Sequence, residues 1–312
     1  MPKTDVVEHA EVAHAPLIFA HRFGRWDLTR TPRVVGILNV TPDSFSDGGR
    51  FIEPREAARH AERMIEEGAD AIDIGAQSTR PGAGEPVGAE EEWARIGPVI
   101  AALKARAGQV PLSVDTYRAE VARRALADGA AMINDVTALM YEPGLADVVA
   151  AAGAGLVLMH SRGGPGGFHD SDVKDYDDVA DDVRWELYMA LRRALVRSVP
   201  EESIALDPGV GFSKRPVHSV GVLRGLPRLT DLGRPLYIGV SRKSFLGALT
   251  DEPVDERLAA GLGATVAAYA LGARIFRTHD VRATKDALTL AEALLSEGAV
   301  VETAAALEEK RA

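Results

Sequence analysis

The most constraining feature of this sequence is a regular alternation of short apolar segments with longer amphipathic ones. Eight segments are short, apolar and β-branched, as is typical of strands covered on both faces; they are 34–40, 70–75, 111–115, 131–136, 154–160, 203–207, 236–240 and 274–278. Eight amphipathic segments separate or follow them and predict helices; they are 54–67, 91–106, 118–128, 143–151, 176–198, 217–231, 255–271 and 281–296. Right-handed crossovers between such units give a parallel sheet, and eight units close a (β/α)8 barrel.

The domain organisation follows from the same pattern. Because no linker interrupts the alternation, we expect a single domain over 17–296, and an open doubly wound sheet is the alternative architecture. Two short stretches at 17–20 and 26–29 predict a β-hairpin that covers the bottom of the barrel. We expect residues 1–16 to form a flexible tail and residues 297–312 a helical or disordered tail.

The overall composition excludes several classes of protein. A formal net charge of −10 argues against a nucleic-acid or anionic-membrane surface, so an anionic substrate requires local cations. The chain has no cysteine, which excludes disulfides, thiolate catalysis and cysteine-ligated zinc and fits a cytoplasmic protein. We find no signal-peptide pattern and no apolar run of transmembrane length.

Polar residues stand at nearly every point where a predicted strand ends. In a barrel of this type the carboxyl ends of the strands meet on one face and carry the chemistry. The residues at these ends are Asn39, 77–82 (QSTRPG), Asp115, Asn134 and Asp135, 160–163 (HSRG), Asp207, 241–243 (SRK) and 277–280 (RTHD). One such residue is often only a helix cap, and Asp115 and Asp280 are candidates for that role. A histidine such as His160 is more often structural than catalytic. The 169–172 stretch (HDSD) is more typical of a solvated loop than of a metal site.

The chemical types at the strand ends form two groups. Asp115, Asn134 and Asp207 offer two carboxylates and an amide, which suit a flat heterocycle with an amidine or guanidine edge. The cationic group consists of Arg80, Arg242, Lys243, Arg277 and His279. Most of it lies after the last two strands, the usual phosphate-binding place of this fold, and predicts a phosphate or diphosphate site. Asn39 supplies a neutral oxygen suited to Mg2+, which prefers phosphate, water and few protein ligands.

Two loops at 41–50 and 78–88 are rich in glycine and proline and are candidate lids over such a site. Neither contains a Walker A sequence, and Gly209-Val210-Gly211 is too short for a dinucleotide fingerprint.

Eight motifs, taken together and in order, resemble the dihydropteroate synthase family of the folate pathway. They are GILNVTPDSFSDGG, DIGAQSTRPGA, SVDTYRAEVA, INDVTAL, LMHSRG, LDPGVGFSK, GVSRKSFLG and RTHDV, and they span about residues 34–290. The resemblance implies a (β/α)8 barrel, usually a homodimer. It also implies that 6-hydroxymethyl-7,8-dihydropterin diphosphate and p-aminobenzoate are joined to give dihydropteroate and diphosphate with Mg2+. Sulfonamides, which mimic p-aminobenzoate, are then expected to compete.

The resemblance also implies roles for particular residues. The pterin pocket is expected to contain Asp115, Asn134, Asp207 and Lys243. The diphosphate and Mg2+ site is expected to contain Asn39, Arg277 and His279, with Ser78 and Thr79 at its rim. The surroundings of p-aminobenzoate are expected to contain Phe45, Arg80, Pro81, Phe212, Ser241 and Lys243. By helix composition and family analogy, Arg257–Leu271 and Asp286–Glu297 are candidate dimer surfaces.

The departures from the family pattern are small, and three other functions are distinguishable from it. Ala76 and Gln77 stand where many members have Gly and Glu, and the 163–172 loop (GGPGGFHDSD) has no assigned role. A pterin-binding methyltransferase would need a corrinoid partner and no cation group. A Schiff-base aldolase would use Lys243 on a carbonyl substrate. An inactive paralogue would bind pterin without turnover.

Overall fold

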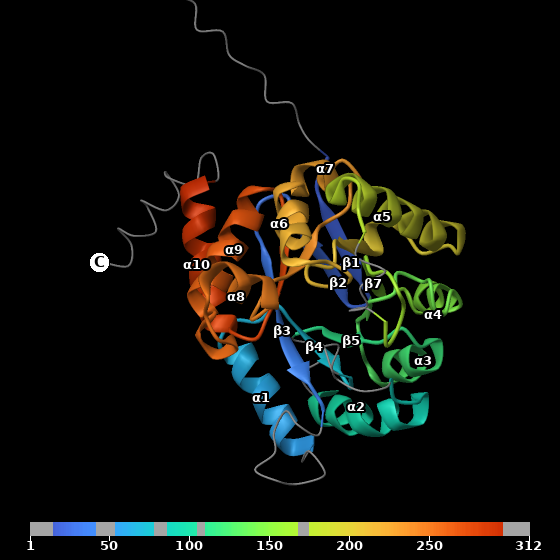
Figure 1. Cartoon of the computed structure of the whole chain (residues 1–312). Helices are drawn as coiled ribbons and strands as arrows, with labels where there is room; N and C mark the ends of the chain where they lie inside the picture. Colours follow the sequence, from blue (N-terminus) through green and yellow to red (C-terminus); the bar gives the residue numbers. More distant parts are fainter. Residues whose placement is uncertain (1–14, 42–53, 78–85, 105–109, 168–174, 296–312) are drawn as a thin grey trace, which may run out of the picture.

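The computed structural model describes residues 15–41, 54–77, 86–104, 110–167 and 175–295, and its strands form the expected barrel (Figure 1). The eight strands are β3 (Arg33–Asn39), β4 (Ala71–Gly75), β5 (Leu112–Asp115), β6 (Met132–Asp135), β7 (Gly155–Met159), β8 (Ile204–Asp207), β9 (Tyr237–Gly239) and β10 (Ile275–Thr278). All paired neighbours are parallel, in the order β8-β7-β6-β5-β4-β3-β10-β9. A parallel bridge between Leu206 and Leu236 joins the two ends of this order, which closes the barrel and rules out the open sheet.

Helices surround the strands in sequence order, as Figure 1 shows. They are α1 (Pro54–Glu66), α2 (Ala89–Leu103), α3 (Ala119–Asp128), α4 (Leu145–Ala152), α5 (Val179–Val196), α6 (Pro216–Arg224), α7 (Leu226–Thr230), α8 (Ser244–Thr250), α9 (Leu258–Ala270) and α10 (Val281–Leu295). Short 3-10 turns, η3 (Glu201–Ser203) and η4 (Val254–Glu256), precede β8 and α9. The apolar face of each helix packs on the outer face of the strands, so one continuous core lies between the two layers.

Two helical segments differ from the sequence prediction. The expected helix at 217–231 is divided at Gly225 into α6 and α7. A Cβ at Gly225 would lie 2.3 Å from the Cβ of Ala180, so this close approach to α5 requires glycine. The segment after β9 contains an additional short helix, α8, which the amphipathic pattern did not reveal because it is only seven residues long.

The predicted hairpin is present and fills the bottom of the barrel. Strands β1 (Ile18–His21) and β2 (Gly24–Asp27) are antiparallel, with Phe19 opposite Trp26. Both side chains are buried in a second core that includes residues from the amino-terminal halves of the barrel strands. Phe19 lies so close to Gly155 that a Cβ there would be 2.8 Å from its ring. One end of the barrel is therefore closed, and only the carboxyl ends of the strands are open to a ligand.

The strand register brings the polar strand ends to one level. Asn39 is the register partner of Gly75, Gly75 of Asp115, and Asp115 of Asn134.

Within the described ranges, no helix is long and apolar enough to cross a membrane. Both predicted tails lie almost wholly outside these ranges, as do most of the two candidate lids.

Candidate active site

A cavity of about 490 Å³ opens at the carboxyl ends of the barrel strands. Every site residue predicted from the sequence that falls within the described ranges lines it; these are Asn39, Asp115, Asn134, Asp207, Phe212, Ser241, Lys243, Arg277 and His279. They come from six of the eight strands or the loops that follow them. The expected residues Phe45, Ser78, Thr79, Arg80 and Pro81 lie outside the described residues.

Arg277 lies between two carboxylates inside this cavity. Its Nε donates to Oδ2 of Asp73 at 2.7 Å, and its Nη2 donates to Oδ2 of Asp115 at 3.1 Å. The Nδ2 of Asn134 also donates to Oδ2 of Asp73, at 3.1 Å. One aspartate on β4 thus orients a cation on β10 and an amide on β6.

Asp73 is a residue that sequence reasoning missed. Its side chain is fully buried in the middle of β4, where both neighbours are isoleucines. A buried charge in an apolar strand requires a partner, because an unpaired ion is costly to remove from water. That was the available signal, but the sequence alone did not identify Arg277 as the partner.

The Asp115 carboxyl group in this cluster has a raised pKa. Burial, and then the nearby charge of Asp73, raise the pKa of Asp115 to about 7, although Arg277 acts in the opposite direction. Asn134 is buried, and within the described part of the chain its Oδ1 accepts no hydrogen bond. The wall formed by β5 and β6 therefore presents acceptors that suit the N–H groups of a ligand.

The opposite wall combines Asp207 with Lys243 and Phe212. Asp207 is buried, and its Oδ1 accepts from the backbone N–H of Gly209 at 2.7 Å. Burial raises the pKa of Asp207, and the nearby Lys243 cation opposes this shift. Burial lowers the pKa of Lys243 to about 8. The Lys243 ammonium donates to the carbonyl of Val210 and lies 4.7 Å from the centre of the Phe212 ring.

The cations after β9 and β10 are ordered by their own contacts. The Oγ of Ser241 and the Nδ1 of His279 are 3.0 Å apart. The Nη2 of Arg242 donates to Oδ1 of Asp280 at 2.8 Å, so Asp280 is an ion-pair partner as well as a residue at the start of α10. Asp115 is not the cap of α3, since that helix begins at Ala119, with Arg118 as its N-cap.

Two further candidates from the sequence, His160 and the 169–172 stretch, do not belong to this cavity as described. His160 is buried, and both of its ring nitrogens have hydrogen-bonding partners, which favours the structural interpretation. The HDSD stretch at 169–172 lies outside the described residues.

The arrangement is suited to one kind of ligand. Acceptors on β5, β6 and β8 line the same cavity as the cations Lys243, Arg277 and His279. A planar, donor-rich heterocycle with an anionic substituent matches both sets of groups at once. The described residues contain no group of three or more acidic, histidine or cysteine side chains that could hold a metal ion. A divalent ion at Asn39 would accordingly take most of its ligands from an anionic substrate and water, a donor set that Mg2+ accepts.

Comparison with known proteins gives a consistent family. Residues 35–279 match the model of the family described as pterin binding enzyme. The chain is 44% identical over 270 residues to the dihydropteroate synthase of Synechocystis sp., covering 86% of this chain and 92% of that protein.

Solved structures agree with the sequence comparison. The chain is similar to Xanthomonas albilineans dihydropteroate synthase with 4-aminobenzoic acid, with a TM-score of 0.79, 45% identity and coverage of 86% of this chain and 95% of the other. It is also similar to Yersinia pestis dihydropteroate synthase in a sulfonamide drug complex, with a TM-score of 0.81, 39% identity and coverage of 89% and 98%.

The geometry predicts that the substitution Asp73→Asn shifts the titration of Asp115. Asparagine keeps an acceptor for Arg277 and Asn134 but removes the negative charge that raises the pKa of Asp115. The pKa of Asp115 should fall below its value of about 7, and Asp115 should be more fully ionised at neutral pH. Carboxyl 13C NMR across pH 4–9, with Asp115→Asn to assign the signal, measures this shift. An unchanged or higher pKa in a folded Asp73→Asn protein would contradict the electrostatic account.

Proposed function

Because this chain belongs to the pterin binding enzyme family, we propose that it is a transferase of the folate pathway with the activity of its dihydropteroate synthase relatives. It condenses 6-hydroxymethyl-7,8-dihydropterin diphosphate with p-aminobenzoate and releases 7,8-dihydropteroate and diphosphate. The family relationship and the cavity support this reading over the methyltransferase, aldolase and inactive-paralogue alternatives.

The proposal rests on two sets of side chains, one of acceptors and one of cations, that line the same cavity. Asp115, Asn134 and Asp207 supply the acceptor wall for a pterin, whose edge is rich in N–H donors. Arg277 and His279 supply the cations for a diphosphate, which neither a methyltransferase nor an aldolase needs. The two groups come from strands distributed around the whole barrel, so their convergence depends on the complete fold.

The mechanism follows from the bond that must break. The aryl amine is neutral near pH 7 and needs no strong general base, so the barrier lies in separating the pterin methylene carbon from the diphosphate oxygen. Arg277 and His279 stabilise the negative charge that develops on the leaving group. Asp115 and Asp207 stabilise the positive charge that develops on the pterin. Each well-placed group of this kind contributes about 3–4 kcal/mol.

In this proposal the aryl amine lies beside Phe212 and Lys243, which both line the cavity. This position follows from the resemblance and fits an apolar ring next to a cation. As a mimic of p-aminobenzoate, a sulfonamide competes for the same space. By the same resemblance, Ser241 lies next to this subsite, and the undescribed Phe45, Thr79, Arg80 and Pro81 complete it.

A magnesium ion is part of the proposal. Asn39 is the residue that would hold it, together with substrate and water oxygens, as the donor set allows. When bound, the ion would neutralise charge on the diphosphate.

We also propose that the protein acts as a cytoplasmic homodimer with one barrel domain, residues 17–296, in each subunit. Exposed leucines on the expected contact helices support the dimer; they are Leu258 on α9 and Leu290, Leu294 and Leu295 on α10.

The activity is tested in a single assay. The purified chain is incubated with dihydropterin diphosphate, p-aminobenzoate and Mg2+, and diphosphate and dihydropteroate are both measured. We expect equal release of the two products, loss of release with EDTA and competition by a sulfonamide. Pterin binding without product would contradict the proposal and favour an inactive paralogue or a methyltransferase.

Substitutions at the two walls test the residue roles. Asp115→Asn and Lys243→Ala each should lower turnover by roughly 10²-fold or more. The first removes an anion that stabilises the positive charge on the pterin, and the second removes the ammonium that lies beside Asp207, Val210 and Phe212. Circular dichroism should show a folded barrel in both variants. Turnover near that of the unmodified chain would show that the assignment is wrong, and unfolding would favour a structural role.

A further inference from the structure

The loop between β8 and α6 has a backbone that must be held in place. Gly209 has φ +64°, and a Cβ at this position would lie 1.9 Å from the carbonyl oxygen of His160. Ser213 also has a positive φ, of 50°, which is uncommon for a residue with a side chain. Backbone of this kind persists only where surrounding contacts determine it.

Lys214 makes some of those contacts from inside the protein, and the hydroxyl of Ser213 makes others with the backbone of Arg162. Its side chain is buried, and its Nζ donates to the carbonyl oxygens of Gly209 and Phe212, each at 3.1 Å. The same Nζ lies 2.8 Å from Nδ1 of His160. Burial lowers the pKa of Lys214 well below its usual value, and Asp207 opposes this shift. When protonated, the ammonium has three donors and no acceptor, and these three partners satisfy it.

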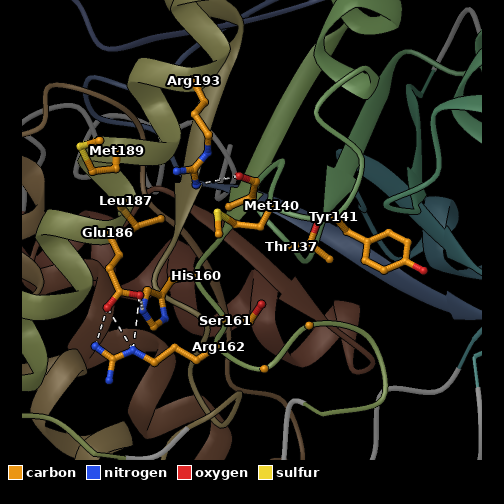
Figure 2. Close-up of a pocket in the computed structure, with 13 residues that line it drawn as sticks. Thr137, Met140, Tyr141, His160, Ser161, Arg162, Glu186, Leu187, Met189 and Arg193 are labelled. Atoms are coloured by element: carbon orange, nitrogen blue, oxygen red, sulfur yellow. Dashed lines mark hydrogen bonds and ion pairs between the residues drawn. The ribbon is translucent and has the colours of Figure 1, made fainter.

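The hydrogen bonds on His160 fix its tautomer. Figure 2 shows Glu186 between His160 and Arg162, at the edge of a second pocket beside α5. The Nε2 of His160 lies 2.9 Å from Oε2 of Glu186. Burial alone would raise the pKa of Glu186, but the hydrogen bonds from His160 and Arg162 lower it to about 2. Because Glu186 is an acceptor, His160 carries its proton on Nε2 and accepts from Lys214 at Nδ1.

This loop is also a wall of the proposed active site. The N–H of Gly209 binds Asp207, the carbonyl of Val210 binds Lys243, and Phe212 lies under the Lys243 ammonium. The two backbone oxygens that Lys214 holds therefore flank the segment that orients Lys243.

We propose that Lys214, held by His160 and Glu186, is a positioning residue that fixes the aryl-amine subsite through the Gly209–Phe212 loop. This inference rests on the proposed function and deepens it. Lys214 does not line the cavity, so it acts through Phe212 and Lys243. Asp115 and Asn134 of the pterin wall lie on other strands, whereas Asp207 contacts the loop only through the N–H of Gly209.

The substitution Lys214→Met tests the proposal by separating the two Michaelis constants. Removing the donor to two carbonyls should raise the KM for p-aminobenzoate by roughly tenfold or more. The KM for dihydropterin diphosphate should rise by a smaller factor, because Asp115 and Asn134 hold the pterin from strands outside the loop. A purely structural role would reduce the amount of folded enzyme, which lowers apparent kcat but leaves both KM values unchanged. Two unchanged KM values in folded Lys214→Met would overturn the proposal.

The matched control is Lys285→Met. Lys285 pairs with Asp70, at 2.7 Å, on α10 and away from the cavity. The Lys285→Met variant should leave both KM values unchanged. A similar rise in the KM for p-aminobenzoate in this control would remove the specificity that the proposal requires.

A second pair of variants applies if Lys214→Met does not fold. In His160→Asn the amide oxygen occupies the place of Nδ1, so the contact with Lys214 is kept. In His160→Gln the longer side chain brings the amide to the place of Nε2, so the contact with Glu186 is kept and the contact with Lys214 is lost. His160→Asn should therefore keep a KM for p-aminobenzoate closer to that of the unmodified chain. Equal values for the two variants would refute the role of the Lys214 contact.

The unmodified chain separates this inference from the proposed function. If it forms no product in the assay, the proposed function fails, and the contact is judged by 15N NMR of the histidine rings, with His160 assigned from His160→Asn. A neutral ring protonated at Nε2 supports the contact with Lys214. A ring protonated at Nδ1 would contradict it, whatever the enzyme does.

Discussion

The site depends on the guanidinium of Arg277, held between Asp73 and Asp115. This contact joins β10 to β4 and β5 across the inside of the barrel, with donor–acceptor distances of 2.7 and 3.1 Å. A buried cluster of two carboxylates and one cation is costly to desolvate and leaves an excess negative charge. That excess contributes to the raised pKa of Asp115 and makes the cavity favourable for a ligand that carries donors and develops positive charge.

Both ends of the barrel contribute to the shape of this cavity. The β1–β2 hairpin closes the bottom with Phe19 and Trp26, so the ligand can reach only the carboxyl ends of the strands. At the open end, strand register sets the acceptors on β5 and β6 at one level. The loop after β8, held by Lys214, sets the opposite wall. The side of the site that carries Asp115 and Asn134 is thus made by strands, and the side proposed for the aryl amine is made by a loop.

Much of the fold and part of the site could be predicted from the sequence, for physical reasons. Short strands buried on both faces leave an apolar pattern that the polar strand ends interrupt, so Asp115, Asn134 and Arg277 were evident. Asp73 and Lys214 were not, because their importance lies in partners that are distant in sequence: Asp73 is 204 positions from Arg277, and Lys214 is 54 from His160. The break between α6 and α7 was missed because it depends on a neighbouring helix. The residues expected in the two candidate lids remain predictions.

The central claim is that Arg277 serves both as the partner of two carboxylates and as the group that binds diphosphate. Calorimetric titration of inorganic diphosphate with Mg2+ into the unmodified chain and Arg277→Lys tests it most directly. Lysine keeps the positive charge between Asp73 and Asp115 but lacks the planar fork that binds phosphate oxygens in pairs. The account predicts that the affinity for diphosphate falls at least about tenfold while the protein stays folded. Equal affinity in the two proteins would contradict it.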